Sequence, residues 1–322
     1  MPVVVTGAAG FIGAALSSRL LDRGETAVVG VDCFNTYYDP SLKTDRAAAL
    51  EARPGFQMIT MDVADAPAFA SLIEKLQPKA IVHLAAQAGV RYSIENPFAY
   101  ERANVAGHLS VLEACRASGV KHLVYASSSS VYGERSLDGA FRETDPIDAP
   151  ASLYAATKRS GELMSSCYSR LYGMAQTGLR FFTVYGPWGR PDMAYFGFTQ
   201  KILAGEPIEV YGEGKMARDF TFIDDIIDGI VGVLDHPAQA GEHRLFNIGD
   251  SRPVGLMTMI ETLEHALGQE AIKVMRPMQP GDVSATYADI SRLKALCGYA
   301  PKVKLEAGLP LFVDWYRRRY PS

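Results

Sequence analysis

The sequence predicts an α/β fold in which helices cover both faces of a parallel sheet. Through the first half of the chain, short apolar runs rich in valine and isoleucine alternate with longer segments of helical periodicity. Several runs are apolar throughout, as expected for strands that are buried on both faces. A glycine-rich loop directly follows the first run and precedes the first helical segment. Together these observations favour a doubly wound sheet with a nucleotide site at its carboxyl edge.

The expected elements follow one another in a βαβ rhythm. Helical segments include Ile12–Arg23, Ala66–Lys75 and Ala103–Ala117. Strands are expected at Pro2–Thr6, Ala27–Asp32, Phe56–Asp62, Ala80–Ala85, His122–Ser127 and Thr177–Tyr185. A turn-rich break begins at Gly186, and short strands and helices follow it. We therefore expect a Rossmann-type dinucleotide-binding domain over residues 1–186 and a smaller mixed α/β substrate-binding region over 187–322, partly interleaved with the first.

The composition argues against several functional classes. The 322 residues include 32 basic and 36 acidic side chains, so we expect no polybasic surface for nucleic acid or anionic lipid. No apolar run approaches the ~18 residues of a membrane span, and the first residues lack the basic region of a signal peptide. The histidines and cysteines show no metal-ligand spacing. We expect a cytoplasmic protein with reduced thiols, no metal site, and no nucleic-acid or membrane partner.

The loop after the first expected strand has the spacing of a dinucleotide-binding fingerprint. Gly7 permits a tight turn, Gly10 lets a pyrophosphate approach the backbone, and Gly13 lets the following helix pack closely on the sheet. The helix N-terminus then presents free N–H groups and the positive end of its dipole to the phosphates. The strand before the loop and the helix after it make the motif more specific than the glycines alone.

The acidic residue Asp32 ends the second expected strand and indicates which cofactor binds. Its carboxylate can accept hydrogen bonds from the adenosine ribose and would repel a 2′-phosphate, so NAD is favoured over NADP. Asp62 ends the third strand, where it can hold the adenine amino group. The residues expected to bind NAD are Gly7, Gly10, Phe11, Ile12, Gly13, Asp32, Asp62, Val63, Leu84, Ala85, Ala86, Asn104, Tyr154 and Lys158.

Tyr154 and Lys158 are spaced to lie on one face of a helix, one turn apart. A phenol with a pKa near ~10 is a poor base at neutral pH, but a nearby ammonium and the positive nicotinamide ring favour the phenolate. Tyr154 can then take a proton from a hydroxyl while a hydride leaves the same carbon. A run of four serines, residues 127–130, follows the fifth strand and can hold the reacting oxygen near Tyr154.

Four motifs together resemble those of the extended short-chain dehydrogenases/reductases that epimerise, dehydrate or decarboxylate nucleotide sugars. They are the glycine loop, the serine run, Tyr-x-x-x-Lys and the stretch Arg-Phe-Phe-Thr-Val-Tyr-Gly-Pro. Within this family the chain is most similar to the UDP-glucuronate 4-epimerases, over essentially its whole length. The most distinctive stretch is Leu179-Arg-Phe-Phe-Thr-Val-Tyr-Gly-Pro-Trp-Gly-Arg-Pro-Asp-Met193.

The resemblance implies catalytic and substrate-binding roles for individual residues. Ser128 matches the catalytic Ser/Thr, while Tyr154 matches the base and Lys158 its partner. Arg218 matches an arginine that grips the UDP pyrophosphate, and Asp282 resembles a position near the nucleotide ribose. The residues expected to bind the UDP-sugar are Arg91, Ser128, Ser129, Tyr154, Thr183, Arg190, Arg218, Gln279 and Asp282.

Two positions depart from the pattern of the UDP-galactose epimerases. Thr183 stands where that family has Asn, which agrees with the glucuronate branch, and Gln279 stands where it has a second phosphate-binding Arg. The substitution at Gln279 leaves the exact diphosphate contacts open. The resemblance also implies a homodimer that forms through Ala103–Ala117 and Ser152–Tyr172.

The favoured reaction is reversible inversion at carbon 4, which interconverts UDP-glucuronate and UDP-galacturonate through a 4-keto intermediate. That intermediate is a β-keto acid and loses carbon dioxide readily, so Ser129 and Thr183 are candidates to hold its carboxylate out of the reactive alignment. A UDP-glucuronate decarboxylase, a neutral UDP-sugar 4-epimerase and a non-catalytic NAD-binding regulatory protein remain open alternatives. A dehydratase is disfavoured because Ser129 and Ser130 stand where it needs an Asp-Glu pair.

Overall fold

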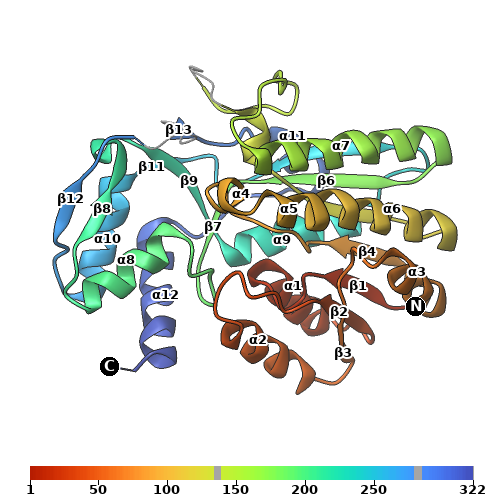
Figure 1. Ribbon diagram of the computed structural model, residues 1–322, viewed down its shortest axis with the longest axis horizontal. Coiled ribbons are helices and arrows are strands. Elements are labelled where there is room, and N and C mark those ends of the chain that lie inside the picture. Colours follow the sequence, from red (N-terminus) through yellow and green to blue (C-terminus); the bar gives the residue numbers. More distant parts are fainter. Residues whose placement is uncertain (134–138, 279–284, 322) are drawn as a thin grey trace.

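The computed structural model describes residues 1–133, 139–278 and 285–321, and a seven-stranded sheet is its largest element (Figure 1). All neighbouring strands in this sheet are parallel, and their order is β10-β6-β5-β4-β1-β2-β3. The strands are β1 (Val3–Thr6), β2 (Val28–Asp32), β3 (Phe56–Thr60), β4 (Ala80–His83), β5 (Leu123–Ser128), β6 (Gln176–Phe181) and β10 (His243–Ile248). The chain runs outward from β1 to β3 and then returns to β4 on the other side of β1, so the predicted doubly wound sheet is confirmed.

Helices cover both faces of this sheet, because successive side chains of each strand point in opposite directions. Val3 and Val5 of β1 pack in one core with α1 (Phe11–Asp22) and α9 (Ile223–Asp235). Val4 lies in a second core with α3 (Ala66–Leu76) and α6 (Gly107–Ser118). The flanking helices are α7 (Leu153–Tyr172) beside α6, α11 (Ser291–Cys297) beside α9, and α2 (Ser41–Glu51) beside α1 and β3.

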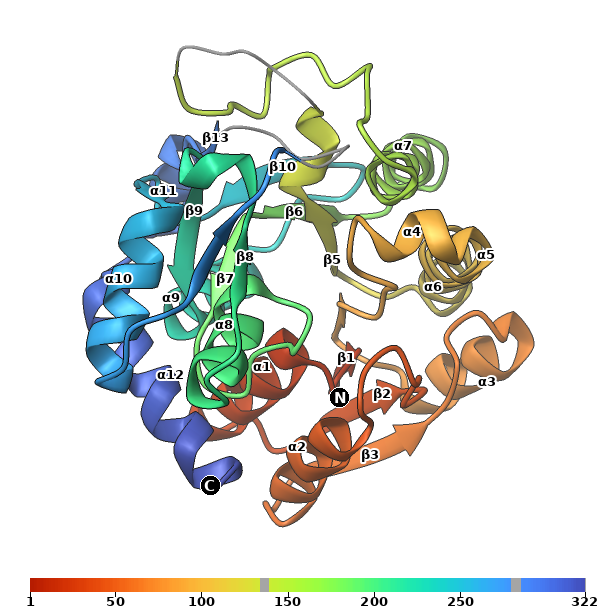
Figure 2. The same cartoon turned by 60° about the vertical axis from the view of Figure 1, so that its left-hand side comes forward.

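A smaller group of elements stands beside the sheet, on the left in Figure 1. It contains a mixed four-stranded sheet of β7 (Thr183–Tyr185), β9 (Ala217–Phe222), β11 (Pro253–Gly255) and β13 (Ala285–Thr286). It also contains the parallel pair β8 (Ile208–Val210) and β12 (Lys273–Met275), with helices α8 (Ala194–Leu203), α10 (Leu256–Leu267) and α12 (Leu305–Arg319). Helix α12 comes down beside α2, where Arg319 pairs with Asp45 (Figure 2).

The structure corrects two of the predicted elements. The expected strand Thr177–Tyr185 is wrong as a single element, because it is β6 followed by β7 in a different sheet. After Phe182 N–H donates to the carbonyl of Ile248, where β10 ends, the chain crosses to pair with β9. Both strands are buried, so the sequence pattern does not reveal the crossing.

The expected helix Ala103–Ala117 begins too early. Residues Glu101–Ala106 form a π-helical turn, and the α-helix begins at Gly107. The other predicted strands and helices appear within two residues of their expected bounds, as is usual at fraying ends. The division at residues 186 and 187 stays a prediction, although β10 and α9 both belong to the layers of the larger sheet.

The described residues contain neither a helix suited to cross a membrane nor a cluster suited to hold a metal ion. None of their helices combines the length and hydropathy that a membrane span requires. No group of His, Cys, Asp and Glu within these ranges is placed to hold a metal ion. The acidic pair Asp224 and Asp225 lies in the first turn of α9, a favourable place for negative charge.

Three histidines are held neutral within the packed layers. Burial is the main cause that lowers the pKa of His108 to about 3, and it lowers the pKa values of His122 and His243 to about 4. Each ring nitrogen Nε2 has a hydroxyl partner: Ser165 for His108, Thr177 for His122 and Tyr125 for His243.

These histidines predict an acid-labile fold. The unfolded chain binds protons near pH 6.5 and the folded chain only near pH 3 to 4, so their stabilising contribution is complete above pH 6.5 and is lost as the pH falls. Each histidine contributes a slope of roughly 1 kcal/mol per pH unit. His122→Leu should therefore flatten the pH dependence of the free energy of unfolding between pH 6.5 and 4.5, measured by urea denaturation.

The exposed residue His265 provides the matched control, and His265→Gln should keep the parent's slope. Burial raises the pKa of Asp219 to about 6, which acts in the opposite direction. The difference between the two variants therefore isolates the histidine effect better than the parent's slope does. An unaltered slope in His122→Leu would contradict the prediction.

Candidate active site

A cavity of about 730 Å³ opens at the carboxyl edge of the seven-stranded sheet, where the strand order reverses. One wall comes from the loops that follow β1, β2, β4 and β5. The opposite wall comes from β7, α8 and residues 209–216 between β8 and β9. Ligands of open parallel sheets bind at this edge, so the cavity is the candidate active site.

The glycine loop forms the floor of this cavity. Gly7 has φ +71°, and a Cβ atom there would lie 2.7 Å from the amide nitrogen of Ala85. A Cβ atom on Gly13 would lie 2.1 Å from the carbonyl oxygen of Gly7. Helix α1 has no side-chain cap and no acidic residue in its first turn, so its first N–H groups can receive a phosphate. The residues therefore fit a dinucleotide pyrophosphate.

Asp32 and Asp62 both line the cavity, each in a different setting. The Asp32 carboxylate accepts hydrogen bonds from the amides of Ala9 at 3.0 Å and Phe34 at 2.9 Å. These bonds hold the carboxylate next to the glycine loop. The Asp62 carboxylate pairs with the guanidinium of Arg102 and accepts a bond from the amide of Ala64. The other expected NAD contacts that line the cavity are Gly10, Phe11, Ile12, Val63, Leu84, Ala85 and Ala86.

Asn104 is the one expected NAD contact outside the lining of this cavity among the described residues. Its side chain accepts from the amide of Gln87, donates to the carbonyl of Gln87 and donates to the hydroxyl of Thr157. Asn104 thus fixes the loop after β4 against α7. Sequence reasoning also missed Asn35 and Lys43, which line the cavity and are joined by a hydrogen bond. Their position just after Asp32 was the available signal.

Three candidate catalytic side chains converge on the same cavity. Ser128 ends β5, Tyr154 lies in the first turn of α7, and Lys158 follows one turn later. Helix α7 starts here because the hydroxyl of Ser152 caps it by accepting from the amide of Ala155. The ammonium of Lys158 donates to the carbonyl of Ala126 at 2.9 Å, which ties it to the end of β5.

Burial sets the ionisation of this pair before any ligand binds. It raises the pKa of Tyr154, while the Ser128 hydroxyl and the charge of Arg190 lower it. Burial lowers the pKa of Lys158 to about 8, and Arg190 adds to that effect. Burial therefore disfavours the charged forms of both Tyr154 and Lys158.

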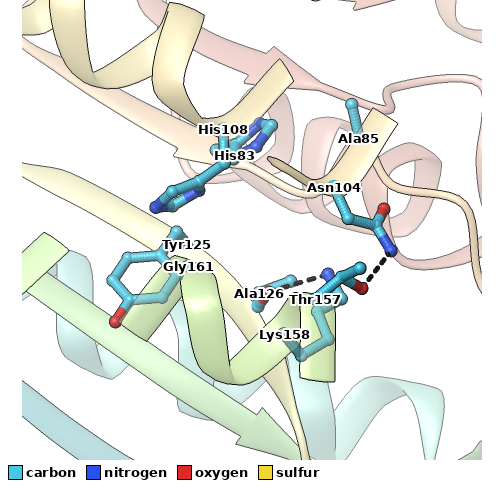
Figure 3. A pocket seen from close by; sticks show the side chains of 9 residues that line it. All are labelled: His83, Ala85, Asn104, His108, Tyr125, Ala126, Thr157, Lys158 and Gly161. Atoms are coloured by element: carbon cyan, nitrogen blue, oxygen red, sulfur yellow. Dashed lines mark hydrogen bonds between the residues drawn. The ribbon is translucent and has the colours of Figure 1, made fainter. Parts of the chain in front are cut away.

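A second, small cavity of about 10 Å³ is also lined by Lys158, and Figure 3 shows its lining side chains. It has room for about one water molecule. His83 and His108 form one side of it, and burial lowers the pKa of both rings. Both rings are therefore neutral, and Lys158 is the only cation in the lining.

Three of the expected substrate contacts line the large cavity, and they come from both of its walls. Ser129 follows β5, whereas Thr183 and Arg190 lie on or after β7. The guanidinium of Arg190 pairs with Asp192, which in turn accepts a hydrogen bond from the hydroxyl of Tyr37 at 3.1 Å. Sequence reasoning missed Asp192 and Tyr37, because they come from separate parts of the chain.

The remaining substrate contacts have different placements. Arg91 lines the cavity and lies over the ring of Tyr211, 5.2 Å from its centroid. Arg218 is on β9, and its guanidinium contacts the carbonyl of Ala217 and the sulfur of Met216. Met216 lines the cavity, whereas Arg218 is absent from its described lining. Gln279 and Asp282 lie outside the described residues.

Comparisons with known proteins find relatives over the whole chain. A model of the NAD dependent epimerase/dehydratase family matches residues 3–249. A probable UDP-glucuronate 4-epimerase of Rhizobium meliloti is 47% identical over 337 residues, covering 99% of this chain and 98% of the relative. UDP-glucuronate 4-epimerase 1 of Arabidopsis thaliana is 47% identical over 333 residues, covering 99% of this chain and 77% of the relative. The UDP-glucuronic acid 4-epimerase of Bacillus cereus, solved with UDP-glucuronic acid and NAD, superposes with a TM-score of 0.92 at 36% identity, covering 99% of this chain and 100% of that one.

We predict that a side chain at Gly13, even a single methyl group, strongly lowers NAD retention. The parent protein should release NAD+ or NADH on denaturation, measured by chromatography. Gly13→Ala forces its Cβ against the Gly7 carbonyl, so the loop must move and the purified protein should retain at most a tenth of the parent's NAD. Gly197→Ala is the matched control, because this helical position in α8 has open space around it. Full retention of NAD by Gly13→Ala would refute the assigned role of the loop.

Proposed function

The chain belongs to the NAD-dependent epimerase/dehydratase family, and from this premise we infer that it is a UDP-glucuronate 4-epimerase. NAD is its cofactor. The observation that carries the proposal is the convergence of Ser128, Tyr154 and Lys158 on the cavity that the glycine loop floors. Similarity to UDP-glucuronate 4-epimerases over 99% of the chain supports the choice of substrate.

The reaction inverts carbon 4 of the sugar and needs no net oxidant. When bound, NAD+ supplies reversible hydride transfer at that carbon. Tyr154 takes the proton of the 4-hydroxyl, and Ser128 holds the same oxygen by a hydrogen bond. Lys158 favours the phenolate of Tyr154 by its positive charge. Tyr154 returns the proton after the keto sugar has turned its other face to the cofactor.

The 4-keto uronate intermediate imposes a second demand on the site. Its carboxylate leaves as carbon dioxide when the bond from carbon 5 to carbon 6 stands perpendicular to the carbonyl plane. Thr183 and Ser129 offer hydroxyl groups that hold the carboxylate away from this alignment. Arg190 lines the same cavity in an ion pair with Asp192, and the hydroxyl of Tyr37 donates to that carboxylate.

Incubation of the purified protein with UDP-glucuronate, followed by NMR, tests the proposed activity. The expected product is UDP-galacturonate. Formation of UDP-xylose would replace the proposal with a decarboxylase, and a preference for UDP-glucose would replace it with a neutral-sugar epimerase. If the protein binds NAD but turns over neither UDP-glucuronate nor UDP-glucose, the proposal is replaced by a non-catalytic NAD-binding regulatory protein.

The other substrate contacts belong to the same proposal. Arg218 and Asp282 bind the nucleotide portion of the substrate, because they match positions of the family that do so. Arg91 and Gln279 are further substrate contacts, and the exact diphosphate contacts stay open because Gln279 replaces a phosphate-binding Arg. We also propose a cytoplasmic homodimer that forms through α6 and α7. The exposed side chains of Leu109 on α6 and Leu163 on α7 support such an interface, because 41% and 54% of their surfaces are accessible.

Tyr154→Phe should abolish turnover while leaving the fold and NAD content unchanged. The ring remains, and only the oxygen that transfers the proton is lost. General base catalysis is typically worth ~10²–10⁴-fold, so kcat should fall by at least 10²-fold in an assay with UDP-glucuronate. Circular dichroism and the released nucleotide provide the controls. Near-parental turnover would remove Tyr154 from the mechanism.

Thr183→Val should change the product as well as the rate. The variant keeps the shape and deletes the hydroxyl, and a hydrogen bond to a charged group is worth roughly 1.5–3 kcal/mol. Epimerisation should slow by about ten- to a hundred-fold. A UDP-4-keto-pentose should appear beside UDP-galacturonate, with NADH formed in equal amount. Parental turnover without added decarboxylation would exclude this role for Thr183.

A further inference from the structure

Arg46 is a buried arginine outside the proposed chemistry, and it joins the two walls of the active site. Only 3% of its surface is exposed. Its guanidinium donates to the carbonyl of Ala9 in the glycine loop at 3.0 Å. It also donates to the hydroxyl of Tyr38 and to the carbonyls of Trp188 and Gly189, which directly precede the cavity residue Arg190.

The recorded partners of Arg46 are carbonyl and hydroxyl oxygens rather than carboxylates, and its Nε atom is buried without a partner. If one of these oxygens moves away, a buried N–H group of the guanidinium loses its acceptor, which costs free energy. The planar fork of arginine suits the task, because it reaches several acceptors in fixed directions. Arg46 therefore restrains both loops together.

The loop on the substrate side requires such a restraint. Trp188 has φ +63°, a left-handed conformation that is unfavourable for a bulky residue and persists only where the surroundings enforce it. Its carbonyl is one of the acceptors of Arg46, and its ring packs on Trp315 with centroids 5.3 Å apart. Two residues later the same loop presents Arg190 to the cavity.

We propose that Arg46 is a positioning residue that locks the segment 186–193, and with it Arg190, to the cofactor loop. The amide of Ala9 donates to the carboxylate of Asp32, and its carbonyl accepts from Arg46. Ala9 therefore connects Asp32 and the glycine loop, through Arg46, to segment 186–193. Order in the cofactor loop is thereby passed to the wall that faces the sugar. The proposal rests on the proposed function for the identity of the substrate, whereas the restraint itself does not depend on it.

The test compares Arg46→Met with Arg53→Met. Methionine keeps an unbranched stem and removes the guanidinium. Arg53 follows the same helix but binds Ser18 and Asp22 on α1, far in sequence from the substrate loop. Arg46→Lys is the second variant, because it keeps the charge without the fork. Hydrogen–deuterium exchange of peptides covering 186–196 reports on the restraint in the NAD-loaded protein without substrate.

Arg46→Met should raise exchange in peptides 186–196 by at least ten-fold and lower kcat/KM for UDP-glucuronate by about 10- to 100-fold, since misplacement by ~1 Å costs rates of this order. Arg46→Lys should lie between Arg46→Met and the parent, and Arg53→Met should match the parent. Lower thermal stability in Arg46→Met with parental exchange and parental kcat/KM would overturn the proposal. If the parent does not turn over UDP-glucuronate, the proposed function fails, and the exchange of segment 186–196 alone then decides the role of Arg46.

Discussion

The geometry of the reactive groups depends on a buried ion pair between Glu162 of α7 and Arg180 of β6, whose side chains are 0% and 1% exposed. The hydroxyl of Ser127 donates to the same carboxylate at 2.6 Å, and Ser127 precedes Ser128. Glu162 lies one helical turn after Lys158, so this single carboxylate sets the distance between the end of β5 and the catalytic face of α7. Two buried charges are favourable only when the remaining donors are satisfied, and Arg180 also bonds the hydroxyl of Tyr132.

This anchor makes one side of the cavity rigid and leaves the other side to be fixed by different means. The catalytic side follows from strands and a capped helix, whose positions the sheet determines. The substrate side is a loop with a strained residue at Trp188, and side-chain contacts from α2 and α12 restrain it. The two sides of the cavity are therefore held by different kinds of contact, hydrogen-bonded strands and a capped helix on one side and long-range side-chain contacts on the other.

Much of the fold and part of the site could be predicted from the sequence, because those features repeat local rules. Strand, glycine loop and helix are adjacent in the chain, so Gly7, Gly13 and Asp32 were recognisable together. Tyr154 and Lys158 are one helical turn apart, and Ser128 ends a buried strand. The division of Thr177–Tyr185 between two sheets was not predictable, because both halves are buried strands and the change depends on which partner strand continues. Arg46 was missed because its partners Ala9, Trp188 and Gly189 are distant in sequence. Asp192 was missed although its partner Arg190 is only two residues away, because nothing local distinguishes this ion pair from solvated charges.

A mobile sugar also places demands on how affinity is distributed over the substrate. If the sugar must leave one orientation and enter another, tight contacts to its ring would hinder the reaction, so binding energy has to come from the nucleotide. The cavity agrees with this division, because the wall between β8 and β9 offers an aromatic ring at Tyr211 and an apolar chain at Met216. Near Tyr154 the lining is polar, with the hydroxyls of Ser129 and Thr183 and the cation of Arg190. These groups can grip a carboxylate, which lies at the edge of the sugar, and leave its hydroxyl-bearing faces free to exchange. The lining of the cavity thus offers apolar and aromatic contacts on one segment and polar contacts on others, as the proposed function requires.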